Sequence, residues 1–160
     1  MPIYMNYNSL AVKGDVTAAG WQDWIELNSL QWGVGRGISS PTGGNKDRES
    51  AAPSISEITV TKAQDASTGK LLTEAYQGGG VKVVIDMVKT DQGQLAKYLT
   101  YELEDTMISG YSLSSGGDRP SESLSLNFST INCIPQVANK DGTLSSSDAV
   151  KYDIGQGKIV

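Results

Sequence analysis

The stretch Ser123-Leu124-Ser125-Leu126-Asn127-Phe128-Ser129 alternates between polar and apolar side chains at every position. A period of two is the spacing of a β-strand, because successive side chains point to opposite faces. The apolar side chains share one face, which is predicted to pack on a core. The polar side chains share the other face, which is predicted to meet water; they include Ser125, Asn127 and Ser129. The stretch therefore predicts a half-buried strand of an antiparallel sheet.

The same alternation recurs along the chain before this stretch. Between Val81 and Met87 the odd-numbered side chains are apolar, and the opposite face carries Lys82 and Asp86. The segment Leu99–Glu104 alternates in the same way, with its carboxylates on a face that is predicted to be solvated. Further strands are expected at Ile3–Tyr7, Trp24–Trp32, Ile55–Lys62 and Val150–Ile154.

Two irregularities are expected within these strands. The apolar positions are even-numbered up to Phe128 but odd-numbered from Ile131, so a bulge or bend near Thr130 is needed to reconcile the two phases. The run Tyr98–Leu113 is also longer than an average strand of about 5–6 residues. Gly110 is predicted to mark a kink or bulge within it.

One short helix is expected, over Thr68–Tyr76, with Ser67 or Thr68 as its cap. Its apolar residues are predicted to share one helical face; they are Leu71, Leu72, Ala75 and Tyr76. The run Gly78-Gly79-Gly80 is predicted to end the helix, since glycine accepts the left-handed conformation there. With a single helix among many strands, the fold class is predicted to be mainly β.

Length and loop content indicate one domain with two long connections. A chain of 160 residues fits one domain better than two, and no composition shift divides it. The segments Gly33–Pro53 and Val137–Ser147 are predicted to be loops. Loops longer than about 12–15 residues are uncommon in compact domains and are usually functional or disordered.

Composition excludes several functional classes. The net charge of −5 and the pI of about 4.6 provide no basic surface for nucleic acid or for an anionic membrane. The chain has no His and only one Cys, Cys133, which removes the usual nucleophilic triads and zinc sites. Cys133 itself is expected to act as a small buried hydrophobe. No catalytic residue, metal or cofactor is therefore expected, and the protein is predicted not to be an enzyme.

Aromatic residues leave one alternative open. Six of them could form a carbohydrate-binding platform; they are Trp21, Trp24, Trp32, Tyr98, Tyr101 and Tyr111. Aromatic residues in strands more often pack in the core or at subunit contacts. A β-sandwich module that binds carbohydrate through exposed Trp and Tyr residues is the alternative function.

Several segments, in order along nearly the whole chain, carry a family resemblance. They are Gly20–Leu27 leading to Gln31-Trp32-Gly33, Thr61-Lys62 followed by Asp65, Tyr98–Tyr111, Gly117–Pro120 with Glu122–Phe128, and Val150–Asp153. Together they resemble the Hcp family, the haemolysin-coregulated proteins of type VI secretion systems. The resemblance implies a single domain over residues 1–160, a small antiparallel β-barrel of two packed sheets with one flanking helix.

The resemblance also implies a structural function and a set of partners. Six copies are expected to close into a ring, and rings to stack into a tube inside a contractile sheath on a baseplate. A spike protein is expected at the tube tip and small effector proteins in the lumen. The N-terminus lacks the basic segment and the apolar core of a secretory signal peptide. The protein is therefore expected to be made in the bacterial cytoplasm and exported by the type VI system, without nucleic-acid or membrane partners.

Three groups of residues are predicted to serve this assembly. The loop Gly33–Pro53 is expected to reach the next ring through its charged residues, which are Arg36, Lys46, Asp47, Arg48 and Glu49. The helix is expected at the subunit boundary or outer wall, where it would present Leu71, Leu72 and Tyr76. The polar strand face with Ser125, Asn127 and Ser129 is expected to line the lumen.

Overall fold

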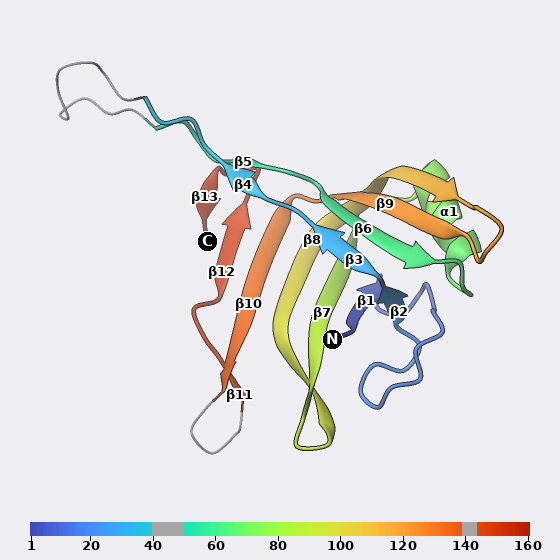
Figure 1. The fold of residues 1–160 in the computed structure, drawn as a ribbon. Coiled ribbons are helices and arrows are strands. Elements are labelled where there is room, and N and C mark those ends of the chain that lie inside the picture. The colour runs from blue at the N-terminus through green and yellow to red at the C-terminus, as the bar shows by residue number, and fades with distance from the viewer. Residues whose placement is uncertain (40–49, 139–143) are drawn as a thin grey trace.

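The computed structural model describes residues 1–39, 50–138 and 144–160. It consists of antiparallel strands and one helix (Figure 1). In the N-terminal half the elements are β1 (Ile3–Tyr7), β2 (Ile25–Leu27), β3 (Ser29–Gln31), β4 (Val34–Gly35), β5 (Ser54–Ile55), β6 (Ile58–Ala63) and α1 (Thr68–Gln77). They are followed by β7 (Val81–Asp91), β8 (Gln94–Ser114), β9 (Ser121–Asn127), β10 (Thr130–Ala138), β11 (Leu144–Ser146), β12 (Val150–Asp153) and β13 (Lys158–Ile159). No helix in the described part of the chain is long and apolar enough to cross a bilayer.

Two antiparallel sheets share the 21-residue strand β8. The first half of β8 lies in a sheet with the order β13-β12-β10-β8-β7-β1-β2, and its second half pairs with β9, followed by β6 and β3. The two sheets also meet away from β8, where the chain passes from β2 to β3 across Asn28. The backbone N–H of Asn28 donates to the Thr61 carbonyl oxygen at 2.7 Å. The two-sheet, mainly β fold is confirmed. The ladders do not close into a barrel, however, because among the described strands β2 pairs only with β1 and β3 only with β6.

Both predicted irregularities are present. The register of β8 against β9 shifts between Ile108 and Gly110, which places the bulge where glycine was expected. Between β9 and β10, Phe128 and Ser129 bend the chain, so that it leaves the second sheet and joins the first. The bend explains why the apolar phase changes there.

The core lies between the sheets and confirms the alternating pattern. Leu124 and Leu126 have no exposed surface, and Phe128 is 5% exposed. The other fully buried apolar side chains include Met5, Ile25, Ile58, Val60, Leu71, Val83, Ile85 and Leu103. Each such side chain contributes about 1.5–3 kcal/mol when it is buried. Period two therefore identifies the core-facing side of each long strand.

The helix α1 begins after Ser67 as expected, but two details differ from the sequence prediction. Gly78 is extended, with φ −67°, and is not left-handed. Glycine is needed for space instead, because a Cβ atom there would lie 2.6 Å from the carbonyl oxygen of Glu74. The predicted apolar face is also wrong at one position: Leu71 is fully buried, whereas Tyr76 is 81% exposed.

The segment predicted as a long loop is partly ordered as a two-stranded ribbon. β4 pairs with β5, and Ile38 and Ser50 form a bridge farther along the same two arms. The ribbon projects from the body of the protein beside β12 and β13 (Figure 1). Its base is thus held by backbone hydrogen bonds, and only residues 40–49 of the predicted loop lie outside the described chain.

The alternation predicted that the face of the first sheet with Asp86 is solvated, but in the structure this face is covered. The segment between β1 and β2 folds over it and forms a second apolar cluster, with Tyr4, Val16, Trp21 and Val88. The side chain of Asp86 is consequently only 4% exposed. A strand pattern indicates which side chains share a face, but it does not indicate what covers that face.

One core residue offers a test of polar burial. The hydroxyl of Tyr7 is buried and has no hydrogen-bond partner among the described residues. Burial and, to a smaller extent, the charge of Glu74 raise the pKa of Tyr7 to about 12. An unsatisfied buried group costs about 1–3 kcal/mol, so Tyr7→Phe is expected to raise the free energy of unfolding by about 1 kcal/mol in urea denaturation. Tyr76→Phe, at an exposed position, is the control and should change it by less than about 0.5 kcal/mol.

Candidate assembly surfaces and binding site

The described part of the chain contains no cluster of three or more His, Cys, Asp or Glu side chains that could hold a metal ion. The thiol of Cys133 is half-buried, and burial raises its pKa, so it is neutral at pH 7. The features that stand out instead are one apolar surface, one buried ion network and one hollow above a buried carboxylate.

An apolar hollow of about 250 Å³ lies where the base of the ribbon meets the last strands of the first sheet. We call its main lining residues the ribbon–edge patch; they are Trp32, Val34, Ile55, Val150, Tyr152 and Ile159. Three of these side chains are strongly exposed: Ile159 by 70%, Val34 by 59% and Val150 by 48%. Contiguous exposed apolar surface of this kind usually marks a site of protein–protein contact.

The patch lies beside β13, an edge strand of the first sheet. β13 pairs with β12, and no other described strand pairs with it; at the other end of the first sheet, β2 pairs with β1. Such free edges are normally covered or paired, because their backbone groups otherwise template contacts with other chains. The molecule thus carries an open edge at β13 with an apolar patch beside it, whereas β2 continues across Asn28 into β3 of the second sheet.

The predicted stacking residues are only partly described. Arg36 follows β4 on the ribbon and is exposed. The other four fall outside the described residues; they are Lys46, Asp47, Arg48 and Glu49. The ribbon brings Arg36 away from the body, and a stacking role for this group stays a prediction.

The three helix residues predicted at a subunit boundary are not brought together. Leu71 belongs to the core, Leu72 is half-buried and Tyr76 points into solvent. Only Tyr76 presents a large apolar surface that another chain could contact. Its role at a boundary stays a prediction.

The predicted lumen residues lie along β9 and the bend after it. Ser125 is half-buried in the second sheet, between Thr59 and Gly110 in the register, and Asn127 is exposed. Ser129 donates from its hydroxyl to the Glu104 carbonyl oxygen at 3.3 Å. Ser125 and Asn127 share the face of β9 opposite Leu124 and Leu126, Ser129 lies in the bend, and the position of all three relative to a lumen stays a prediction.

A buried ion network joins β6, β9 and the start of α1. The ammonium of Lys62 has no exposed surface and lies 2.5 Å from Glu122 and 2.9 Å from Asp65. Glu122 also accepts hydrogen bonds from the hydroxyls of Thr68, at 3.0 Å, and Tyr111. Burial and the bond to Glu122 raise the pKa of Tyr111 to about 12. The network fixes the helix to two strands.

This network was not predicted from the sequence, although the sequence carries a signal for it. Lys62 is in phase with Ile58 and Val60, and Glu122 is in phase with Leu124 and Leu126. Both charges thus occupy core-facing positions, and they are directly opposite each other in the β6–β9 register. A charge at a core-facing position predicts a buried partner, because a buried ion is costly unless it is paired.

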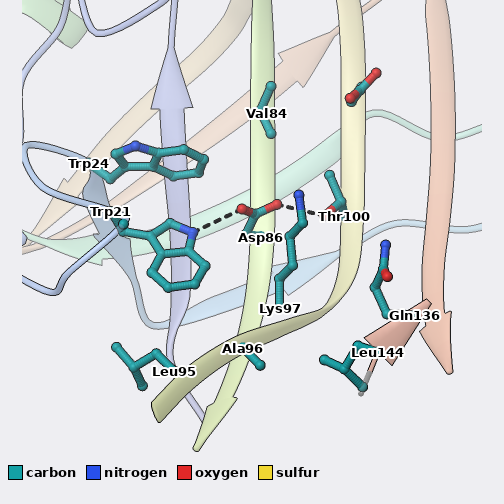
Figure 2. Close-up of a pocket in the computed structure, with 12 residues that line it drawn as sticks. Trp21, Trp24, Val84, Asp86, Leu95, Ala96, Lys97, Thr100, Gln136 and Leu144 are labelled. Carbon is teal, nitrogen blue, oxygen red and sulfur yellow. Dashed lines mark hydrogen bonds between the residues drawn. The ribbon is translucent and has the colours of Figure 1, made fainter. Parts of the chain in front are cut away.

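A second buried carboxylate lies on the outer face of the first sheet. Asp86 accepts a hydrogen bond from the indole Nε1 of Trp21 at 2.9 Å and another from the hydroxyl of Thr100 at 2.7 Å (Figure 2). Above it lies a hollow of about 590 Å³, whose lining also includes Trp24 and Glu102. The alternation of Val81–Met87 predicted a solvated face at Asp86, and no role was predicted for this residue.

The aromatic residues do not form the single platform that a carbohydrate module would need. Trp21 and Trp24 cover the outer face of the first sheet. Trp32 packs edge-on against Tyr101 with ring centroids 5.6 Å apart, and Tyr101 belongs to the core cluster on the inner face. Trp21 and Trp24 thus lie on one face of the first sheet, and Trp32 and Tyr101 lie on the core side.

Comparison with known proteins is consistent with this architecture. The model of the family described as "Type VI secretion system effector, Hcp" matches residues 4–134. A solved type six secretion system protein is 19% identical, with a TM-score of 0.88 and 99% of each chain covered. Hcp1 from Salmonella typhimurium is 18% identical, with a TM-score of 0.77, and covers 99% of this chain and 98% of its own.

A third solved structure has a similar fold. A type VI secretion system effector from Yersinia pestis is 16% identical, with a TM-score of 0.70, over 94% of this chain and 98% of its own. No curated protein is significantly similar to this chain in sequence. At these identities the structures show the shared fold, and the family model, which covers most of the chain, shows the family. The chain belongs to the Hcp family of type VI secretion system proteins.

Proposed function

We propose that this chain is the structural subunit of a type VI secretion tube and that six copies close into a ring. Rings would stack into a tube inside a contractile sheath on a baseplate, with a spike at the tip and small effectors in the lumen. Family membership supports a tube or effector protein of this system. The observation that carries the ring proposal is the ribbon–edge patch, which leaves Val34 and Ile159 exposed beside a free strand edge.

The open β13 edge supports a ring in particular. A closed ring needs heterologous contacts, in which one surface of a subunit meets a different surface of the next. The β13 edge with its apolar patch is one such surface, and a different surface of the neighbouring subunit would cover it. Such a contact would bury apolar surface and cover the open β13 edge.

The native mass of the purified protein tests the proposal. A mass of about six times the 17.0 kDa subunit supports the ring. A protein that stays monomeric at high concentration contradicts it. A monomer that also binds a glycan would point to a carbohydrate module instead.

Ring stacking is assigned to the ribbon and the charged segment that it carries. Arg36 lies on a described arm, and Lys46, Asp47, Arg48 and Glu49 lie between the two arms in sequence. Exposed ion pairs contribute only about 0–1 kcal/mol each, so free rings would stack weakly. Sheath and baseplate would then decide when a tube forms.

Deleting Lys46–Ser50 is expected to leave rings intact and to impair stacking, because these residues lie beyond the ribbon base where β4 pairs with β5. Electron microscopy of ring and tube preparations provides the measurement. Deleting Gly116 and Gly117, in the turn before β9, is a matched control that should leave both rings and tubes unchanged. Intact tubes from the Lys46–Ser50 deletion would overturn the stacking role of this segment.

The lumen and the outer wall are assigned to the remaining polar and helical surfaces. Ser125, Asn127 and Ser129 provide uncharged groups that would let a folded cargo pass without strong adhesion. The helix α1 would lie at the subunit boundary or the outer wall, where exposed Tyr76 could contact a neighbouring subunit or the sheath.

A further inference from the structure

We propose that the hollow above Asp86 binds the guanidinium group of an arginine side chain presented by a partner protein. The site consists of Asp86, Glu102 and Trp24, with Trp21 and Thr100 as positioning residues. It lies on the outer face of the first sheet and shares no residue with the ribbon–edge patch. The proposal therefore does not depend on ring formation.

The first observation is a buried charge held only by neutral groups. Asp86 is 4% exposed, and its two carboxylate oxygens each accept one hydrogen bond, from Trp21 Nε1 and from Thr100 Oγ1. Figure 2 shows the two donors on opposite sides of the carboxylate. They fix its orientation, and each oxygen keeps a lone pair for another donor.

The second observation is the missing counter-charge. Across residues 1–39, 50–138 and 144–160, the Lys–carboxylate pairs within 4.0 Å involve other carboxylates than Asp86. Lys97 lines the hollow and is exposed, but it is in none of these pairs. Buried carboxylates are normally paired with a cation, as Glu122 is with Lys62. Asp86 is thus a buried anion that a ligand can neutralise.

The third observation is the wall of the hollow. The indole of Trp24 is half-buried and lies on the same side of Asp86 as Trp21 (Figure 2), while Glu102 provides a second carboxylate. A guanidinium is planar, stacks on an aromatic face and donates several N–H groups in one plane, which an ammonium cannot do. An indole on one side of Asp86 and a second carboxylate on β8, the strand of Thr100, therefore favour arginine over lysine.

The size of the hollow indicates that arginine arrives as part of a larger segment. About 590 Å³ is within the range of sites for drug-sized ligands and is more than one guanidinium fills. Apolar groups such as Leu95 and Leu144 line the rest of it and suit the aliphatic part of the side chain and its neighbours. The net charge of −5 on this chain further favours a basic partner segment.

The test uses acetyl-arginine amide as the probe and acetyl-citrulline amide as its uncharged counterpart of the same shape. The indole N–H resonance of Trp21 reports on the site, because this group is bonded to Asp86. Arginine is expected to bind at least about tenfold more tightly than citrulline, since hydrogen bonds between charged groups are the stronger ones. Equal affinities, or tighter binding of spermidine or of an oligosaccharide, would overturn the proposal.

Variants locate the binding on these residues. Asp86→Asn keeps the shape and removes the charge, and it should weaken arginine binding about tenfold. Glu102→Gln, at a half-buried position, should weaken it about threefold. Asp118→Asn removes an exposed carboxylate outside the hollow and should have no effect. Unchanged affinity in Glu102→Gln and in folded Asp86→Asn would refute the site.

Discussion

Replacing Lys62 with methionine is expected to lower the free energy of unfolding by about 3–5 kcal/mol, the usual cost of breaking a buried ion pair by removing one partner. Lys62 has no exposed surface and lies between Glu122, which is 1% exposed, and Asp65, which is 11% exposed. Methionine fills a similar volume, so the loss reflects the charge and not a cavity. Without Lys62, the Glu122 carboxylate stays buried with only the neutral donors Thr68 and Tyr111.

Urea denaturation followed by circular dichroism measures the loss, and an exposed pair provides the control. Lys151 lies 3.4 Å from Glu104, with side chains 39% and 51% exposed. Lys151→Met should change the free energy of unfolding by less than about 1 kcal/mol. The double variant Lys62→Met/Glu122→Leu should be more stable than Lys62→Met alone, because it no longer buries an unpaired Glu122 carboxylate. Equal stability of Lys62→Met and Lys151→Met would contradict the role of the network.

The fold could be predicted from the sequence because most strands have one dry and one wet face. The alternation in Ser123–Ser129 identified Leu124, Leu126 and Phe128 as core residues, and the phase change before Ile131 predicted the bend between β9 and β10. Both inferences depend only on the period of the backbone. That period is fixed by local geometry, which a sequence displays directly.

The candidate binding site could not be predicted, since it depends on contacts between distant segments. Asp86 is buried because Trp21, 65 residues earlier, folds over the outer face of the sheet. Nothing in the alternation of Val81–Met87 indicates that this face is covered. Gly14 shows how closely the covering segment packs: a Cβ there would lie 2.4 Å from the Trp24 carbonyl oxygen. Such an approach between backbones is visible only in three dimensions.

In the ribbon, pairing between two segments outweighs the local preference of the sequence. The many glycines and prolines of Gly33–Pro53 predicted a loop, and the pairing of β4 with β5 makes its base a strand pair instead. Turn-forming residues disfavour strands on average, but the partner arm satisfies the backbone of Val34 and Gly35 and outweighs that preference. The consequence is functional, because a paired ribbon holds Val34 and Ile55 beside the last strands of the sheet.

Ile159→Asp is expected to convert the proposed hexamer into monomers. Ile159 is 70% exposed in the subunit and lies on the terminal strand β13, next to Val150 and Tyr152 in the ribbon–edge patch. If a neighbouring subunit covers the patch, the new carboxylate must lose its water without gaining a cation. Desolvating an unpaired charge costs several kcal/mol, and a closed ring of six subunits contains six such interfaces.

Native mass measurement separates an interface effect from a general effect of added charge. Leu113→Asp introduces the same carboxylate at a side chain that is 52% exposed but lies near the end of β8, outside the ribbon–edge patch. This control should keep the hexamer mass, and both variants should keep the stability of the subunit fold, because both positions are solvent-exposed. A hexamer that survives Ile159→Asp would mean that subunits join through other surfaces. Dissociation by both variants would mean that net charge, and not the patch, controls assembly. Only selective loss of the ring at Ile159 identifies the patch as the surface that closes it.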